Sequence, residues 1–395
     1  MSKQHLKKLG KISHVSNGWE ITTVAQACKI RNDLRKPISV DERKGMQGEY
    51  PYYGPTGILD FIDHHRVDGK YALIGEDGDH YLKPTEKPQT TLAEGQFNVN
   101  NHAHIIEGTS KCLTEWFYIY FHNRDITHML SRQGANRYKL NKETLNSLPI
   151  LLPSIDKQAK IYAIFQSCVS AIEKTEALID AKERQFGWLQ KSLMDNDFKS
   201  YSSHLSEYAN IMKQQKIEEV GKLKPLTVKL HCKGIEPNER DMQITLSKKG
   251  RPYFQRFAGE FLIGRQNFHN GGFGIVPEKL DGFIASNAIT TLEINEAKLD
   301  PRYLFYFFSR KGYYLRIGHI MDGTGQKELS DKQIMKLPVS IPNLEKQKEI
   351  VALLNTAQQE IKLFKKLANQ YRTQKRGLMQ KLLSGKWHIK NKEAA

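Results

Sequence analysis

The sequence contains little cysteine: four residues in 395, with no CxxC pair among them. Zinc sites and disulfide frameworks normally show paired spacings, so we expect neither. Four separate thiols suit a reducing cytoplasm. The sequence also lacks a run of about 20 apolar residues, which a membrane span requires. No apolar signal core follows its polar start, MSKQHLKKLGK. We therefore predict a cytoplasmic protein without a membrane partner.

Motifs of a catalytic site are absent as well. The sequence has no GxxxxGK[ST], HExxH or GxSxG, no Asn-Pro-Pro-aromatic run, and no Gly-rich strand-to-helix turn for a methyl donor. His64–His65, His102 and His104 lack the pattern of neighbouring carboxylates or cysteines that a metal site shows. The acidic turn 76–79 has no lysine at the spacing of a nuclease site. We expect this chain to bind no metal or cofactor and to catalyse nothing by itself.

Positive charge is what the sequence has in excess. It contains 60 Lys and Arg against 43 Asp and Glu, a formal net charge of +17. An excess of this size favours a polyanionic partner, most simply nucleic acid. A basic protein without such a partner is the plainer alternative, and binding to a membrane surface is a weaker one.

One segment of about 47 residues occurs twice. Residues 148–194 and 337–383 align at a constant offset of 189 until a slip of one residue near the end. Each copy opens with Leu-Pro, has a second proline four residues later, and continues into a long amphipathic stretch. Pro153 and Pro342 cannot lie inside a helix, so they fix where two helices of about 38 residues begin. Ser154 and Asn343 are then the predicted N-caps.

Both helices carry an apolar stripe with 4-3 spacing. A sustained period of 3.5 residues is typical of a coiled-coil seam. If a pseudo-twofold axis relates the two halves, the helices pair within one chain and run antiparallel over about 57 Å. Pairing between two chains is the alternative. The predicted seam comprises Ile161, Phe165, Ile172, Ile179, Phe186, Leu189 and Leu193 in the first helix, and Ile350, Leu354, Ile361, Phe364, Leu378 and Leu382 in the second.

The second helix ends in a basic stretch. Between Ile361 and Lys392 there are ten Lys or Arg and no Asp or Glu. Such a stretch is either a solvated helix face or a surface that meets a phosphate backbone or an acidic partner.

Residues 14–147 and 199–336 mix short β-type runs with Gly, Pro and Asn turns. Runs at 71–74 and 261–263 predict strands, and the aromatic runs 116–121 and 303–308 predict helices that bury their rings. The predicted fold is therefore α+β: two mixed α/β domains separated by two long helices. The predicted boundaries are 1–147 and 197–336 for the domains, 148–196 and 337–385 for the helices, and 386–395 for a tail.

Polar loops on both domains supply candidate DNA contacts. Arg and Lys read guanine, Asn and Gln read adenine, and exposed loops on a rigid frame suit this role. Residues 48–57, with three Tyr, two Pro and three Gly, predict such an exposed loop. The candidates are Lys44, Tyr52, Tyr53, Thr56, Arg132, Asn136, Arg137 and Lys139 in the first domain, and Lys249, Arg251, Tyr253, Arg256, Arg265, Gln266, Asn267, His269, Gln326 and Lys327 in the second.

The two Leu-Pro entries, at 148–158 and 337–347, resemble the conserved regions of type I restriction–modification specificity subunits. The helix ends LQKSLM and MQKLLSGK share this resemblance. Residues 48–57 are similar to a Gly-x-Tyr-Pro-x-Tyr-Gly motif of the recognition domains in that family, and Gly18-Trp19-Glu20 to a domain opening. The second domain departs from the pattern, because residues 203–208 lack Gly-Trp.

The resemblance implies that each domain is a target-recognition domain for one half of a split sequence in double-stranded DNA, with the coiled coil as spacer. It implies docking of two methyltransferase (modification) subunits and two restriction (translocase–nuclease) subunits, in a bacterium or archaeon. S-adenosylmethionine, ATP and Mg would bind to those partners. The assembled complex would then be an adenine DNA methyltransferase and ATP-dependent endonuclease.

Two other functions stay open at this point. One is an enzyme, a nuclease or a fused methyltransferase, with a site that no motif identifies. The other is a basic coiled-coil scaffold that binds DNA or RNA without sequence preference. Binding selectivity separates them, because a scaffold shows only a salt-sensitive affinity that is blind to sequence.

Overall fold

The structure is a computed structural model. It describes residues 2–84, 86–132, 138–194, 201, 203–219, 223–239, 251–318 and 328–387. The chain forms two compact units: unit 1 comprises Met1–Glu176 and Leu367–Ala395, and unit 2 comprises Ala177–Lys366. The two long helices, α6 (Ile155–Leu193) and α10 (Leu344–Leu383), each contribute one part to either unit.

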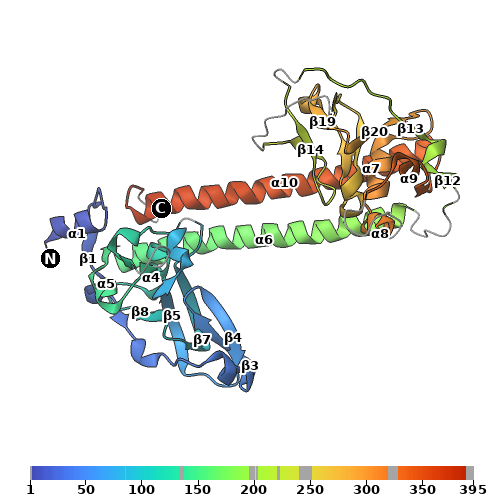
Figure 1. Ribbon diagram of the computed structural model, residues 1–395. Helices are drawn as coiled ribbons and strands as arrows, with labels where there is room; N and C mark the ends of the chain where they lie inside the picture. Colours follow the sequence, from blue (N-terminus) through green and yellow to red (C-terminus); the bar gives the residue numbers. More distant parts are fainter. Residues whose placement is uncertain are drawn as a thin grey trace, which may run out of the picture. The chain divides into compact units, whose positions relative to one another are not determined.

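Unit 1 is built on a six-stranded sheet with the strand order β2-β8-β5-β7-β3-β4, drawn in blue to teal in Figure 1. Strands β3 and β7 pair in parallel and the other neighbours in this sheet are antiparallel. The predicted run 71–74 lies in β5, as expected. The strands are β2 (Lys29–Ile30), β3 (Gln47–Gly54), β4 (Gly57–Ile62), β5 (Val67–Gly75), β7 (Thr90–Val99) and β8 (Ala103–Glu107).

Smaller elements complete unit 1. Strand β1 (Glu20–Thr23) pairs antiparallel with β11 (Pro149–Leu152), just before α6. Helix α4 (Thr114–Phe121) packs on β5 and β7 and buries Trp116, Phe117 and Tyr120, so the prediction that these aromatics are core is confirmed. The remaining elements are α1 (Lys3–Leu9), α2 (Val24–Ala27), η1 (Asn32–Leu34), α3 (Val40–Lys44), β6 (Asp77–Gly78), η2 (Asp79–Leu82), η3 (Thr127–Met129), β9 (Ser131–Arg132), β10 (Tyr138–Lys139) and α5 (Lys142–Ser147).

Unit 2 has a four-stranded antiparallel sheet with the order β13-β20-β17-β18. Three further antiparallel pairs are β12 with β21, β14 with β15, and β16 with β19. The predicted run 261–263 lies in β17. The strands are β12 (Ser203–His204), β13 (Ala209–Ile211), β14 (Leu226–Val228), β15 (Ile235–Pro237), β16 (Tyr253–Gln255), β17 (Phe261–Gly264), β18 (Phe273–Ile275), β19 (Ile284–Ser286), β20 (Ile289–Ile294) and β21 (Pro338–Val339).

The second aromatic helix, α7, buries Tyr303, Leu304, Phe307 and Phe308 in the core of unit 2. Its N-cap is Asp300, whose side chain accepts a hydrogen bond from the Arg302 amide. The shorter helices that the structure describes in unit 2 are η5 (Leu205–Glu207), η6 (Arg265–Asn270), η7 (Glu278–Leu280), α7 (Pro301–Ser309), α8 (Lys311–Ile317) and α9 (Asp331–Met335).

The two long helices begin where the prolines predict. Helix α6 starts two residues after Pro153 and α10 two residues after Pro342. The predicted cap at Asn343 is confirmed, since its side chain accepts from the Lys346 amide at 2.9 Å. At Ser154 it is the backbone carbonyl that accepts, from the Gln158 amide at 2.9 Å.

Within each unit, parts of α6 and α10 pack together. In unit 1, Ile161 and Phe165 share a core with Met379 and Leu382, and Glu176 pairs with Arg372. In unit 2, the α6 residues Phe186, Leu189 and Leu193 share a core with the α10 residues Ile350 and Leu354. Ion pairs join Lys182 to Glu360 at 2.9 Å and Glu183 to Lys365 at 2.6 Å. An early stretch of one helix always meets a late stretch of the other, which confirms the predicted antiparallel order.

In the described part of the chain, none of the helices combines the length and the apolar character that a bilayer crossing requires.

Candidate nucleic-acid interface

The predicted loop 48–57 is instead a β-hairpin. Strands β3 and β4 pair from Gln47↔Ile62 to Gly54↔Gly57, with an irregularity between Gln47 and Tyr50, and Pro55 and Thr56 form the tip. Tyr favours strands, and the tyrosines at 50, 52 and 53 explain why this segment forms a strand and not a loop. Alternate side chains of a strand point to opposite faces of the sheet, so one face of β3 can be buried. Thr56 is exposed at the tip and Tyr53 is half-buried against Phe97, with ring centroids 5.5 Å apart.

The structure contradicts the prediction that Tyr52 lies on the surface and contacts DNA. Its side chain is 1% exposed. The hydroxyl donates to the Lys36 carbonyl at 3.1 Å and accepts from the Ile38 amide at 2.9 Å, while the Arg43 guanidinium lies 4.9 Å from the ring centroid. Tyr52 therefore fixes the segment before α3 to the sheet. Lys44 at the end of α3 is exposed and pairs with Asp41 at 2.7 Å.

Sequence reasoning missed an apolar surface on the same hairpin. Ile58, Leu59 and Phe61 on β4 are each about half exposed, and β4 is an edge strand of the sheet. Apolar side chains can contact the methyl group of thymine in the major groove. The run Gly-Ile-Leu-Asp-Phe-Ile at 57–62 already indicated this apolar surface. A strand points only every second side chain to one face, so its four apolar residues cannot all lie on one buried face.

A second candidate surface in unit 1 follows β9 and β10. Arg132 is exposed, and Tyr138 pairs with it across the two strands. The Lys139 ammonium lies 3.4 Å from the Glu76 carboxylate, which also accepts from Arg35 at 2.9 Å. The candidates Asn136 and Arg137 lie outside the described residues.

In unit 2 the structure contradicts the prediction for Arg256. The residue is 0% exposed. Its guanidinium donates to the side chains of Gln214 and Thr291, the latter at 2.6 Å, and to the Ile289 carbonyl at 2.8 Å. Burial lowers the pKa of Arg256 to about 10. Arg256 is thus a structural residue that joins strand β20 to the segment before β14.

The neighbours of Arg256 differ in exposure. Arg251 is exposed, and Tyr253 on β16 is half-buried. Lys249 lies outside the described residues, as do Gln326 and Lys327. These residues, like the exposed candidates in unit 1, stay predictions.

The predicted loop at 265–272 begins as the 3-10 helix η6. Phe268 anchors it, because its ring is fully buried against Phe273 and Phe308. Asn267 is exposed, whereas Gln266 and His269 are half-buried. The helix ends at Gly271, which has φ +72, a left-handed conformation that favours glycine. Arg265, the first residue, pairs with Glu328 at 2.9 Å and lies 3.7 Å from Asp331. Its charge is therefore already engaged inside the unit.

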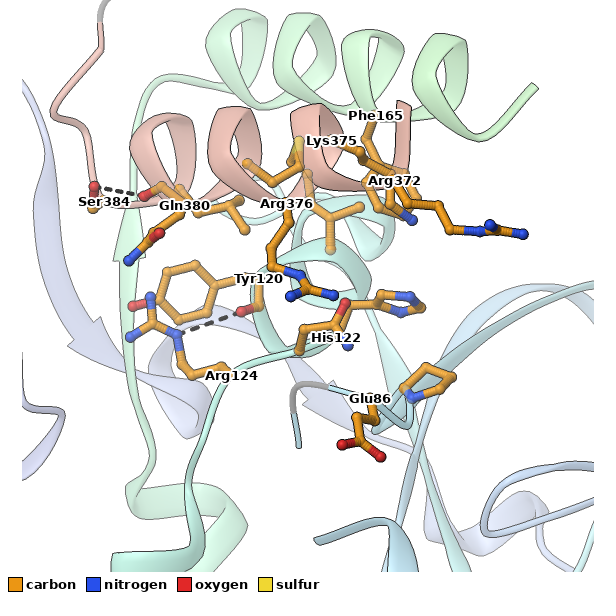
Figure 2. A pocket seen from close by; sticks show the side chains of 15 residues that line it. Glu86, Tyr120, His122, Arg124, Phe165, Arg372, Lys375, Arg376, Gln380 and Ser384 are labelled. Carbon is orange, nitrogen blue, oxygen red and sulfur yellow. Dashed lines mark hydrogen bonds between the residues drawn. The ribbon is translucent and has the colours of Figure 1, made fainter. Parts of the chain in front are cut away.

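The basic end of α10 lines a cavity of about 620 Å³ in unit 1. Figure 2 shows Lys375 and Arg376 of α10 among the side chains that line this cavity, together with Tyr120 of α4 and Arg124, which follows α4. The Arg124 guanidinium lies 4.0 Å from the Tyr120 ring centroid, and the Lys375 ammonium 5.1 Å from that of Phe165. Part of the basic stretch thus faces a concave, partly apolar surface.

The acidic turn at 76–79 does not gather its carboxylates into one site. Glu76 faces Arg35 and Lys139, Asp77 lies 3.2 Å from His102, and Asp79 pairs with Lys87. Among the residues that the structure describes, no group of three or more His, Cys, Asp or Glu side chains could hold a metal ion.

Comparisons with known proteins give the family. The family model for the type I restriction modification DNA specificity domain matches residues 16–184 and again residues 204–370. A Haemophilus influenzae protein assigned as a type I restriction enzyme specificity subunit is 26% identical over 351 residues, which is 84% of this chain and 85% of that protein. The MjaVIII specificity subunit of Methanocaldococcus jannaschii is 20% identical and covers 95% of both chains.

A solved structure agrees at the level of the fold. The type I restriction–modification S subunit of M. genitalium superposes with a TM-score of 0.58 at 14% identity, covering 93% of this chain and 97% of its own. Since the family model matches most of the sequence in two copies, this chain belongs to the family of type I restriction–modification DNA specificity subunits.

Proposed function

We propose that this chain reads a bipartite sequence in double-stranded DNA, with one recognition domain for each half-site. The observation that carries the proposal is that both units share the same arrangement of entry strand and long helix, while their exposed candidate residues differ. In both units a short strand at the domain entry pairs with the strand before a long helix, β1 with β11 and β12 with β21. The exposed candidates differ: Lys44, Thr56 and Arg132 in unit 1, Arg251 and Asn267 in unit 2. One frame with two surfaces suits two unlike half-sites.

The paired helices would act as the spacer between the half-sites. Their antiparallel packing in each unit supports this role, because a pair of regular helices has a fixed rise per residue. The exposed basic face near the end of α10 supports docking of acidic surfaces or phosphate groups. We propose two methyltransferase subunits and two restriction subunits as the partners, with S-adenosylmethionine, ATP and Mg bound by them. Methyl transfer and DNA cleavage would then occur on those chains and not on this one.

The experiment begins with the target sequence. Methylome sequencing of cells that carry this chain with its methyltransferase subunit identifies the modified bipartite site. The purified complex is then bound, at moderate salt, to duplexes carrying the whole site, either altered half, or neither half. We expect each altered half to weaken binding by tenfold or more, since a mismatched base pair costs about 1–3 kcal/mol.

Two results would contradict this proposal. Equal binding to all four duplexes, with a steep loss on adding salt, would identify a sequence-blind scaffold. Methyl transfer or cleavage by the purified chain without partners would identify an enzyme.

A further inference from the structure

An ion pair occurs at the same place in both units with opposite polarity. In unit 1, Glu76 directly follows strand β5 and its carboxylate lies 3.4 Å from the Lys139 ammonium. In unit 2, Arg265 directly follows β17 and its guanidinium lies 2.9 Å from the Glu328 carboxylate. Positions 76 and 265, and positions 139 and 328, are each separated by 189 residues, the offset that relates the two helical repeats.

The backbone shows that these positions are equivalent. The Leu140 amide donates to the Glu76 carbonyl at 2.7 Å, and the Leu329 amide donates to the Arg265 carbonyl at 3.1 Å. Both leucines are buried. The fold therefore makes the same connection twice. In each unit the residue after a central strand is joined, by an ion pair and a backbone hydrogen bond, to the two residues shortly before the last short helix; we call this connection a bridge. Only the signs of the charges change between the two bridges.

The surroundings strengthen each bridge. Glu76 also accepts from Arg35 at 2.9 Å, and Asp331 lies 3.7 Å from Arg265. The side chains of Glu76 and Arg265 are 18% and 23% exposed. An ion pair that is partly shielded from water is worth more than the fully exposed pairs that contribute almost nothing.

Each bridge contains one candidate DNA contact and lies next to others. Lys139 ends β10, which pairs with β9 at Arg132. Arg265 is the first residue of η6, the short helix that carries Gln266, Asn267 and His269. A shift of either bridge would therefore move side chains that are candidates for base readout.

We propose that Glu76 and Arg265 are equivalent positioning residues, and that Arg265 sets half-site specificity through its ion pair with Glu328 rather than by touching a base. This inference rests on the proposed reading of two half-sites. In this inference the Arg265 guanidinium is paired with Glu328 and Asp331 and does not contact DNA. The neighbouring polar residues of η6 are then the ones that face DNA.

Neutral variants of the complex with its methyltransferase test this role. Glu328→Gln, Arg265→Gln and the double variant R265Q/E328Q are bound to duplexes carrying the whole site or either altered half. We expect each single variant to lower discrimination at one and the same half-site by roughly three- to tenfold, and to leave the other half-site unchanged. The double variant should be no worse than Arg265→Gln alone, because both changes break one interaction.

Glu236→Gln is the matched control, since Glu236 pairs with Lys229 at 3.1 Å on the β14–β15 hairpin of the same unit. It should leave both half-sites unchanged. The inference is overturned if E328Q discriminates normally while R265Q does not, which would make Arg265 a direct contact. Additive losses, or a loss at both half-sites with a lowered melting temperature, would also overturn it. If the wild-type complex itself does not distinguish the duplexes, the proposed function fails instead.

Discussion

Gln158 and Gln347 make the same three side-chain hydrogen bonds, one residue in each unit. In both, Oε1 accepts from a backbone amide at the entrance of the aromatic helix, at 2.8 Å, and Nε2 donates to two backbone carbonyls, at 2.8–2.9 Å. Both residues are fully buried. The partners are Leu113, Lys111 and Pro153 in unit 1, and Asp300, Lys298 and Pro342 in unit 2.

We predict that Gln158→Leu and Gln347→Leu each destabilise their own unit by about 1–3 kcal/mol, because leucine leaves buried amide and carbonyl groups without partners. Hydrogen exchange resolved by peptide should show the loss of protection in one unit for each variant. Gln166→Leu is the control, since Gln166 is exposed on α6; its effect should stay within about 0.5 kcal/mol. Equal protection in wild type and Q158L would contradict this role.

Much of this frame could be predicted from the sequence. The helices and their starts after Pro153 and Pro342 followed from strong local signals repeated over several heptads. Their antiparallel pairing followed from the pseudo-twofold axis that the repeat suggested. The aromatic runs were correctly assigned to the core. Gln158 and Gln347 were visible in the repeated entry, but their partners at Leu113 and Asp300 are more than 40 residues away in sequence, which no local pattern reveals.

The candidate contacts could be predicted less well. Tyr52 was assigned to an exposed loop because Gly and Pro flank it, yet the alternation of tyrosines placed it on the buried face of β3. Arg256 was assigned to the surface by its charge, and only the tertiary fold supplies the acceptors, Gln214 and Ile289, that allow its burial. Burial of a polar side chain depends on partners that are distant in sequence.

Arg256 should therefore behave as a stability residue. We predict that Arg256→Leu destabilises unit 2 by about 2–4 kcal/mol, because the change leaves buried acceptors unpaired. Arg251→Leu, at an exposed position nearby, should leave stability within about 0.5 kcal/mol. Chemical unfolding of both variants checks this. A wild-type unfolding curve for R256L, together with weaker binding to DNA, would restore Arg256 as a DNA contact.

His80 should make unit 1 sensitive to acid. Its ring is fully buried, and neither ring nitrogen has a hydrogen-bond partner among the described residues. Burial, opposed by Asp79 and Asp77, lowers the pKa of His80 to about 4. Because this value lies below that of the unfolded chain, about 6.5, the folded state is fully favoured above pH 6.5. It loses stability as pH falls towards 4.

The expected loss from His80 is about 1.4 kcal/mol per pH unit, or about 3 kcal/mol over the whole interval. Urea unfolding of unit 1 at pH 7, 6, 5 and 4 measures it. In His80→Asn the slope should fall by the equivalent of one proton, whatever the change in absolute stability. An unchanged slope would show that folding does not lower the pKa of His80.

The spacer role of the helices predicts a change in DNA spacing. Lys182 and Glu183 on α6 pair with Glu360 and Lys365 on α10, so residues 177–183 and 360–366 form one layer of the helix pair. Deleting both segments keeps the 4-3 seam and removes about 10 Å of rise at 1.5 Å per residue. At about 3.4 Å per base pair, the preferred spacer should shorten by roughly three base pairs. Selection from duplexes with randomised spacer lengths measures this, and an added heptad in both helices should lengthen the spacer equally. If both variants kept the wild-type spacing, the distance between half-sites would be set by something other than the helix pair.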